Sequence, residues 1–277
     1  MENKIRIGAL ISGGGSNLQA IMDSCENGQI SGKVTFIGSD NSRSEGLKRA
    51  AASKVPTFVV DYTSIIRQVH ADPATASLPA DFDYEDILAR QTLVQDWNDD
   101  DKIRSFLISR AIAEAQLLAE MANNSYDLLV LAGFMRTLTP YFIDRVNLDR
   151  SNPRIMNIHP ALLPAFPGTD GYGDTFRYGC KVAGCTVHFI DYGEDTGPII
   201  GQRAFVIAPG DTLESIRQKG LELEWQLYPE CIQLFADGRV KTVKKTFTLK
   251  SGKKLQRTIV EIMPEESDNR RQKTEDR

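Results

Sequence analysis

Short apolar runs alternate with amphipathic stretches along most of the chain, and this pattern predicts an α/β protein. Residues 127–132, Asp-Leu-Leu-Val-Leu-Ala, contain a continuous apolar run after the first residue, which is typical of a strand buried on both faces of a parallel sheet. We therefore expect a mostly parallel, twisted sheet with helices on both faces and a Rossmann-like N-terminal half. The expected strands are 5–11, 34–38, 57–60, 127–132, 155–158, 184–190, 199–200 and 204–207, and the expected helices are 18–22, 47–53, 103–122, 140–145 and 211–234.

A segment in the first half of the chain, residues 63–101, is predicted to be an insertion. It contains two prolines and a group of acidic residues, and it differs in character from the segments on either side. We expect it to be irregular up to a short helix near residues 85–97. His70, which lies inside it, is interpreted as an exposed histidine without a functional role.

The chain beyond residue 240 is predicted to be a charged C-terminal extension, so that the main domain covers residues 1–240. Residues 244–249 and 257–262 could pair as two strands. The final run, 265–277, is almost entirely polar, and such a run cannot bury enough apolar surface to hold one structure. We expect it to be disordered.

A glycine-rich loop follows the first predicted strand. Residues 12–17, Ser-Gly-Gly-Gly-Ser-Asn, lie between that strand and residues 18–22, which have helical spacing. Glycines let backbone N–H groups approach an anion, and the dipole of a helix N-terminus favours negative charge. Ser16 or Asn17 could cap the helix. The loop therefore predicts a phosphate site, and a tight turn without a ligand is the alternative interpretation.

The same loop leaves open a nicotinamide-dependent oxidoreductase. Gly13 and Gly15 match the first two glycines of a dinucleotide fingerprint, but Leu18 occupies the third position. Asp40 follows the second strand and could bind a ribose hydroxyl. The loop alone does not separate this enzyme class from other phosphate-binding proteins.

An amide and an imidazole occur together at the end of another predicted strand. Asn157 and His159 are two residues apart, so their side chains point the same way on a strand. Pro160 cannot donate to a strand ladder, so the strand should end there. Hydrogen-bond donors held at such a junction can stabilise a developing oxyanion. Two polar residues at an ordinary strand–loop junction are the alternative interpretation.

A second polar position follows the apolar run 127–132. Ligands of open α/β sheets bind outside the carboxyl ends of the strands. Gly133 permits close approach of a ligand there, and Arg136 could bind a carboxylate or a carbonyl group. A solvated surface arginine is the alternative.

Composition narrows the function classes. The 277 residues carry a net charge of -4 with pI near 5.5, so nothing indicates nucleic-acid binding. The polar residues 1–4 lead directly into a strand, so no signal peptide is expected, and no apolar run approaches the roughly 20 residues of a membrane span. No metal site is expected either, because no pair of cysteines has the usual ligand spacing. We interpret the four cysteines as reduced thiols in a cytoplasmic protein; they are Cys25, Cys180, Cys185 and Cys231.

Four motifs now stand in a particular order along the chain. They are residues 11–17 (ISGGGSN), 131–136 (LAGFMR), 157–164 (NIHPALLP), and 188–190 (HFI) together with 195–198 (DTGP). This set closely resembles the phosphoribosylglycinamide formyltransferases, the folate-dependent transformylases of purine synthesis. The resemblance covers roughly residues 5–240 apart from the insertion. The third motif alone would indicate only the wider formyltransferase superfamily.

The resemblance implies a role for each matching position. Asn157, His159 and Asp195 match the catalytic trio of the family. The ribonucleotide would lie against Gly15, Ser16, Asn17, Gly133, Ile158, Pro160 and Glu224. The folate would lie against Met135, Arg136, Thr137, Leu138, Asn157, the loop 191–197 and an upstream arginine, for which Arg104 is taken and Arg110 also qualifies.

The implied reaction transfers the formyl group of 10-formyltetrahydrofolate to the amine of glycinamide ribonucleotide, without a metal. Asn157 would donate to the oxyanion, and one such donor is worth about 2.7–4 kcal/mol of barrier. A protonated His159 would be a second donor and could pass a proton to the leaving nitrogen. Asp195 would favour the imidazolium, because a nearby opposite charge stabilises the charged form. His188 is interpreted as structural.

The chain also departs from the family, and other functions remain open. The loop 165–172 has no histidine, which leaves room for a variant amine acceptor. A formyltetrahydrofolate hydrolase is chemically close but would carry an extra N-terminal domain, and a methionyl-tRNA formyltransferase would need a longer basic region after Gly238. A nicotinamide oxidoreductase would leave the catalytic trio without a shared purpose. A phosphosugar-binding protein would need only the glycine loop. Small molecules are the expected partners, and the sequence specifies no oligomeric state.

Overall fold

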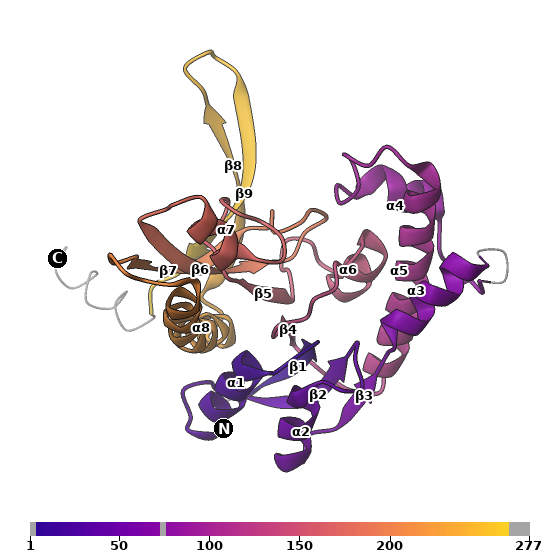
Figure 1. Ribbon diagram of the computed structural model, residues 1–277, viewed down its shortest axis with the longest axis horizontal. Coiled ribbons are helices and arrows are strands. Elements are labelled where there is room, and N and C mark those ends of the chain that lie inside the picture. Colours follow the sequence, from indigo (N-terminus) through magenta and orange to yellow (C-terminus); the bar gives the residue numbers. More distant parts are fainter. Residues whose placement is uncertain (1–3, 73–75, 266–277) are drawn as a thin grey trace, which may run out of the picture.

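The computed structural model describes residues 4–72 and 76–265. The strands of its central sheet are β1 (Ile5–Ile11), β2 (Gly32–Ser39), β3 (Thr57–Val59), β4 (Leu128–Leu131), β5 (Ile155–His159), β6 (Val182–Phe189) and β7 (Ile199–Val206). They lie in the order β3-β2-β1-β4-β5-β6-β7 (Figure 1). The strands from β3 to β5 pair in parallel, whereas β6 is antiparallel to both β5 and β7.

Helices cover both faces of this sheet. They are α1 (Ser16–Glu26), α2 (Glu45–Ala52), α3 (Tyr62–Ala71), α4 (Tyr84–Arg90), α5 (Asp100–Met121), α6 (Pro140–Val146), α7 (Gly171–Arg177) and α8 (Leu213–Ala236). Helices α1 and α8 pack with the sheet in one apolar cluster, and α3, α5 and α6 pack with it in a second (Figure 1). The predicted α/β class, with a mostly parallel sheet between helical layers, is confirmed.

Strand β4 supplies apolar side chains to both clusters. Leu128 and Val130 belong to the cluster with α1 and α8, whereas Leu129 and Leu131 belong to the other. All four side chains are at most 4% exposed. The uninterrupted apolar run thus reflects burial on both faces, as predicted. The chain passes from one side of β1 to the other at β4, and the crevice outside such a switch point commonly holds a ligand.

The insertion is more regular than the sequence predicts. Helix α3 forms where irregular structure is expected, because Asp61 caps it by accepting from the Ser64 N–H at 3.0 Å and Val69 anchors it in the core. Helix α4 packs with α5 and α6 in a third apolar cluster. It ends at Arg90 rather than near residue 97. The insertion is therefore a packed part of the fold.

The C-terminal extension forms a separate two-stranded sheet. Strands β8 (Val240–Thr248) and β9 (Lys254–Ile262) pair antiparallel, so the predicted pairing is confirmed, although both strands are longer than expected. The hairpin projects away from the central sheet (Figure 1). Most of the run predicted to be disordered, residues 266–277, lies outside the described residues.

A buried carboxyl group joins α5 to the segment that follows β4. Glu114 is fully buried and accepts hydrogen bonds from the Thr139 backbone N–H at 2.7 Å and from its hydroxyl at 2.5 Å. Thr139 is the N-cap residue of α6. Burial raises the pKa of Glu114 from 4.5 to about 7, and the bonds from Thr139 offset only part of that effect. This group connects the stability of the fold to pH.

We expect Glu114→Gln to remove a loss of stability that the wild-type protein shows as pH rises from 5 to 8. The folded-state pKa lies above the unfolded value, so ionisation in this range opposes folding. A shift of this size corresponds to about 3 kcal/mol in the free energy of unfolding. Urea unfolding of both proteins at the two pH values measures it. A wild-type-to-variant difference that is equal at pH 5 and pH 8 would contradict the assignment.

Candidate active site

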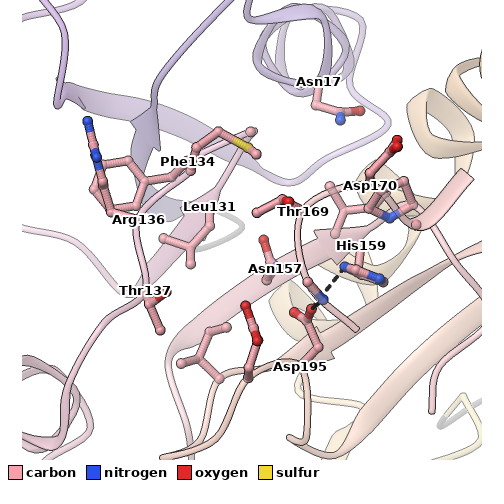
Figure 2. Close-up of a pocket in the computed structure, with 18 of the residues that line it drawn as sticks. Asn17, Leu131, Phe134, Arg136, Thr137, Asn157, His159, Thr169, Asp170 and Asp195 are labelled. Carbon is pink, nitrogen blue, oxygen red and sulfur yellow. Dashed lines mark hydrogen bonds and ion pairs between the residues drawn. The ribbon is translucent and has the colours of Figure 1, made fainter. Parts of the chain in front are cut away.

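The carboxyl end of β5 carries two polar side chains into a pocket. Asn157 and His159 both line it, and His159 is only 3% exposed. Asp195 comes from the loop after β6, and its Oδ2 lies 3.1 Å from Nδ1 of His159 (Figure 2). The antiparallel pairing of β5 with β6 brings the two segments together. The structure thus gathers the three predicted catalytic residues at one point.

The pocket has a volume of about 450 Å³ and is lined by four short segments. They are residues 133–138 after β4, 157–160 at the end of β5, 168–172, and most of the loop 190–195. Helices α1 and α8 contribute Asn17, Arg217, Leu221 and Glu224. Ile158 and Pro160, which the resemblance implies for the ribonucleotide, are among the lining residues.

The charge of His159 is set by competition between burial and two acceptors. Its Nε2 lies 2.8 Å from the Phe166 carbonyl oxygen, and its Nδ1 faces the Asp195 carboxylate. Only an imidazolium could donate to both. Burial nevertheless lowers the pKa of His159 below its usual 6.5, and Asp195 and Phe166 offset only part of this. The expectation for Asp195 is right in sign, but Asp195 alone does not hold the ring charged at pH 7.

Asp195 itself remains a carboxylate. Burial acts to raise its pKa, but the nearby His188 and His159 rings and the hydrogen bond from the Gly168 N–H, 2.8 Å away, together lower it. Its backbone lies in the left-handed region with φ 53°. A side chain at such a position is held by its surroundings, because the conformation itself is unfavourable for a residue other than glycine.

His188, interpreted from the sequence as structural, lies against two of the three predicted catalytic residues, Asn157 and Asp195. It is fully buried, and its Nδ1 lies 2.9 Å from the Phe189 carbonyl oxygen. Since a carbonyl only accepts, Nδ1–H donates to it, and in the neutral ring Nε2 is left to accept from the Asn157 amide at 3.3 Å. Nε2 also lies 3.5 Å from the Asp195 carboxylate. The only signal for this contact is the register that pairs Asn157 with His188.

A buried hydrogen-bond chain forms the opposite wall of the pocket. Asn17 donates to Glu224 at 2.7 Å, and the Tyr172 hydroxyl donates to the other carboxylate oxygen at 2.8 Å. Burial raises the pKa of Glu224, while both hydrogen bonds oppose the shift. The Oδ1 atom of Asn17 has no hydrogen-bond partner among the described residues. This wall thus places a carboxylate, held by two hydrogen bonds, at the pocket, with a buried, unpartnered amide oxygen beside it.

Gly15 and Ser16 begin α1 but lie outside the pocket-lining residues. Gly15 is the N-cap, with φ 70°, and a Cβ there would lie 2.7 Å from the Cα of Gly46. Glycine is therefore required for both its backbone conformation and its close packing. No side chain caps α1, so the prediction that Ser16 or Asn17 does so is wrong; Asn17 turns to Glu224 instead.

The segment after β4 forms the third wall. Gly133, Met135, Arg136, Thr137 and Leu138 all line the pocket, as the resemblance implies. The Met135 N–H donates to Ser12 Oγ at 2.8 Å, which ties this wall to the glycine loop. Arg136 pairs with the buried Asp40. Asp40, the residue proposed to bind ribose in an oxidoreductase, is thus already engaged.

The two candidate arginines of α5 have different environments. Arg104 is exposed and lies over the Tyr84 ring at 5.2 Å, and neither Arg104 nor Arg110 lines the pocket. Arg110 is 8% exposed and lies over the Tyr62 ring, as Arg136 also does. Its Nε and Nη1 have no hydrogen-bond partner among the described residues.

One basic pocket residue was not predicted. Arg217 on α8 lines the pocket and pairs with Asp170 at 3.0 Å. The loop 165–172 has no basic residue of its own, but Asp170 within it recruits this arginine from α8. No local motif marks Arg217, because the contact depends on how α8 packs against α7.

Three further properties concern the described residues alone. Within residues 4–72 and 76–265, no group of three or more His, Cys, Asp or Glu side chains could hold a metal ion. No helix in the same part of the chain is long and apolar enough to cross a membrane. All four cysteines are free.

Known proteins share this architecture. The crystal structure of glycinamide ribonucleotide transformylase 1 from Symbiobacterium toebii matches with a TM-score of 0.67 and 34% identity, covering 94% of this chain and 95% of that one. The phosphoribosylglycinamide formyltransferase of Haemophilus influenzae is 31% identical over 250 residues, covering 90% of this chain and 95% of the relative.

The similarity extends to a family model. The Bacillus subtilis phosphoribosylglycinamide formyltransferase is 32% identical over 222 residues, covering 80% of this chain and 90% of the relative. The model described as formyl transferase matches residues 5–232, from β1 into α8. The chain therefore belongs to the formyl transferase family.

Proposed function

We propose that this protein transfers the formyl group of 10-formyltetrahydrofolate to the amine of glycinamide ribonucleotide, a step of purine biosynthesis. The observation that carries the proposal is the buried contact of His159 with Asp195, with Asn157 beside it, inside one pocket. Relatives that match over most of the chain are named phosphoribosylglycinamide formyltransferases, which supports the choice of substrates.

In the proposed reaction the neutral amine attacks the formyl carbon, and a new C–N bond forms as the carbonyl becomes a tetrahedral oxyanion. The bond from that carbon to N10 of the folate then breaks, N10 gains a proton and the attacking amine loses one. Asn157 and His159 donate to the oxyanion. Each donor stabilises the transition state more than the substrate, because the charge exists only there.

The protonation state of His159 fits this sequence of events. Burial keeps the pKa of His159 low in the free protein, while Asp195 raises it. A negative charge developing on the formyl oxygen adds to the effect of Asp195 and favours the imidazolium. The ring thus becomes the stronger donor as the oxyanion forms, and its extra proton is then available for N10.

The two sides of the pocket suit the two substrates. Glu224 offers carboxylate oxygens to ribose hydroxyls, and the N-terminus of α1 at residues 15–17 favours the phosphate. The wall at residues 133–138 and the loop 190–195 would hold the folate. Of the two candidate arginines, Arg110 is preferred for the folate, because it lies over the same Tyr62 ring as Arg136, which lines this wall, whereas Arg104 lies over Tyr84.

The direct test follows deformylation of 10-formyltetrahydrofolate, or of its 10-formyl-dideazafolate analogue, by absorbance. We expect deformylation that depends on glycinamide ribonucleotide. Deformylation without the ribonucleotide would identify a hydrolase and overturn the proposal. No deformylation under either condition would exclude both activities, and a panel of other amine acceptors would then be measured.

Asn157→Ala should lower kcat by about 10²–10³-fold, the usual effect of removing one oxyanion donor. The side chain is half-buried and bonds only to His188 among the described residues, so the variant should fold. Steady-state kinetics with both substrates saturating measures the loss, and thermal unfolding provides the control. A kcat within threefold of wild type would exclude Asn157 as an oxyanion donor.

Asp195→Asn should shift the pH dependence of kcat as well as its size. Asp195 raises the pKa of His159, so its removal lowers that pKa. If the imidazolium is the active form, the rate falls as pH rises through this pKa. The descending limb of the profile should therefore move to lower pH in the variant. A limb that stays in place or moves to higher pH would contradict the role given to the pair.

A further inference from the structure

The end of the insertion lies against the loop that carries Asp195. The Thr92 N–H donates to the Tyr192 carbonyl oxygen at 3.1 Å, and the Thr92 hydroxyl donates to it at 3.3 Å. A Cβ at Gly193 would lie 2.8 Å from the Thr92 hydroxyl oxygen, so the Thr92 side chain packs closely against the loop. The side chain of buried Gln91 accepts hydrogen bonds from the backbone N–H groups of Leu93, at 2.6 Å, and Val94, at 3.0 Å. These bonds hold the turn in place.

A charged network fixes the Tyr192 side chain from the same direction. Arg90, at the end of α4, pairs with Asp144 on α6, and the Tyr192 hydroxyl donates to the other oxygen of that carboxylate. The Arg90 guanidinium also lies 5.7 Å from the centre of the Tyr192 ring. The Arg90 and Asp144 side chains are 29% and 24% exposed, so water screens this network less than a surface pair.

The loop between this network and the catalytic carboxylate is short and internally bonded. Asp191 accepts from the Gly193 N–H at 3.1 Å and from the Thr196 hydroxyl at 2.6 Å. Asp195 lies three residues beyond Tyr192, in the unfavourable left-handed conformation. Such a conformation persists only where neighbouring structure holds it. A displacement at Tyr192 would therefore reach the contact between Asp195 and His159.

We propose that Arg90, Asp144 and Tyr192 are positioning residues, through which the insertion holds the 191–197 loop in its catalytic conformation. The proposal rests on the proposed function and assigns the insertion a role in it. Arg90 and Thr92 lie in the segment that the sequence marks as an addition to the family pattern, whereas Asp144 belongs to α6. The insertion thus acts on the site through the loop, without lining the pocket.

Tyr192→Phe is the first variant, because it removes the hydroxyl bond to Asp144 and keeps the aromatic packing. Arg90→Gln removes the charge of the network, and Arg90→Lys restores the charge without the forked geometry. Arg145→Gln is the matched control. Arg145 also joins α6 to the insertion, through Asp81 at 2.6 Å, but neither residue contacts the 191–197 loop.

We expect Tyr192→Phe and Arg90→Gln to lower kcat/KM for the formyl donor by about tenfold, with KM for the ribonucleotide unchanged. The descending limb of the pH profile should move to lower pH, because a looser Asp195 supports the imidazolium less. Arg90→Lys should recover part of the loss. Arg145→Gln should lower the melting temperature by a similar amount and leave both the rate and the pH profile unchanged.

Hydrogen exchange of the 191–197 amides tests the same idea without turnover. Faster exchange in Tyr192→Phe than in Arg145→Gln is expected, whether or not the protein uses the proposed substrates. Equal exchange in the two variants would overturn the proposal. An equal loss of rate in both, in proportion to melting temperature, would overturn it as well. If the wild-type protein transfers no formyl group but the two variants differ in exchange as expected, only the proposed function is refuted.

Discussion

The contact between His159 and Asp195 is the interaction on which the rest of the site depends. Both groups are largely withdrawn from water, so each ionisation state is decided by a few protein neighbours. Burial and the carboxylate act on the ring in opposite directions. In the proposed reaction, a negative charge on the formyl oxygen would therefore add to the effect of Asp195 on the protonation of the ring. On an exposed surface, water would screen the same pair and remove this sensitivity.

Strand β5 has a parallel neighbour on one side and an antiparallel neighbour on the other. This explains how segments that leave different strands line one pocket. The parallel neighbour β4 delivers residues 133–138 from its carboxyl end, beside the carboxyl end of β5. The antiparallel neighbour β6 places His188 opposite Asn157 and then leads into the loop with Asp195. If β6 and β7 were parallel as well, the connection after β6 would have to be a long crossover instead of this loop. The trio thus depends on the boundary between the two halves of the sheet.

The parts of this arrangement that are local in sequence were predictable, and the parts that depend on register or packing were not. Asn157 and His159 are two residues apart on a strand, and that spacing alone places their side chains together. His188 contacts Asn157 only because of the pairing register, and Arg217 reaches the pocket only through the packing of α8. The rotation of α5, which exposes Arg104 and buries Arg110, was likewise not predictable from local sequence. The helix α3 was missed because its capping residue lies outside the segment marked as an insertion.

The Phe166 carbonyl oxygen is a hydrogen-bond acceptor of the His159 ring in this structure. It lies 2.8 Å from Nε2 of His159, the nitrogen that does not face Asp195 and that would donate to the oxyanion in the proposed reaction. A ground-state formyl oxygen, itself a neutral carbonyl, gains little by displacing an equal partner. A charged oxygen gains more, since hydrogen bonds to ionised acceptors are roughly twice as strong as neutral ones. In the proposed reaction, His159 would therefore stay bound to the Phe166 carbonyl while the formyl group is neutral and would donate to the formyl oxygen once it is charged.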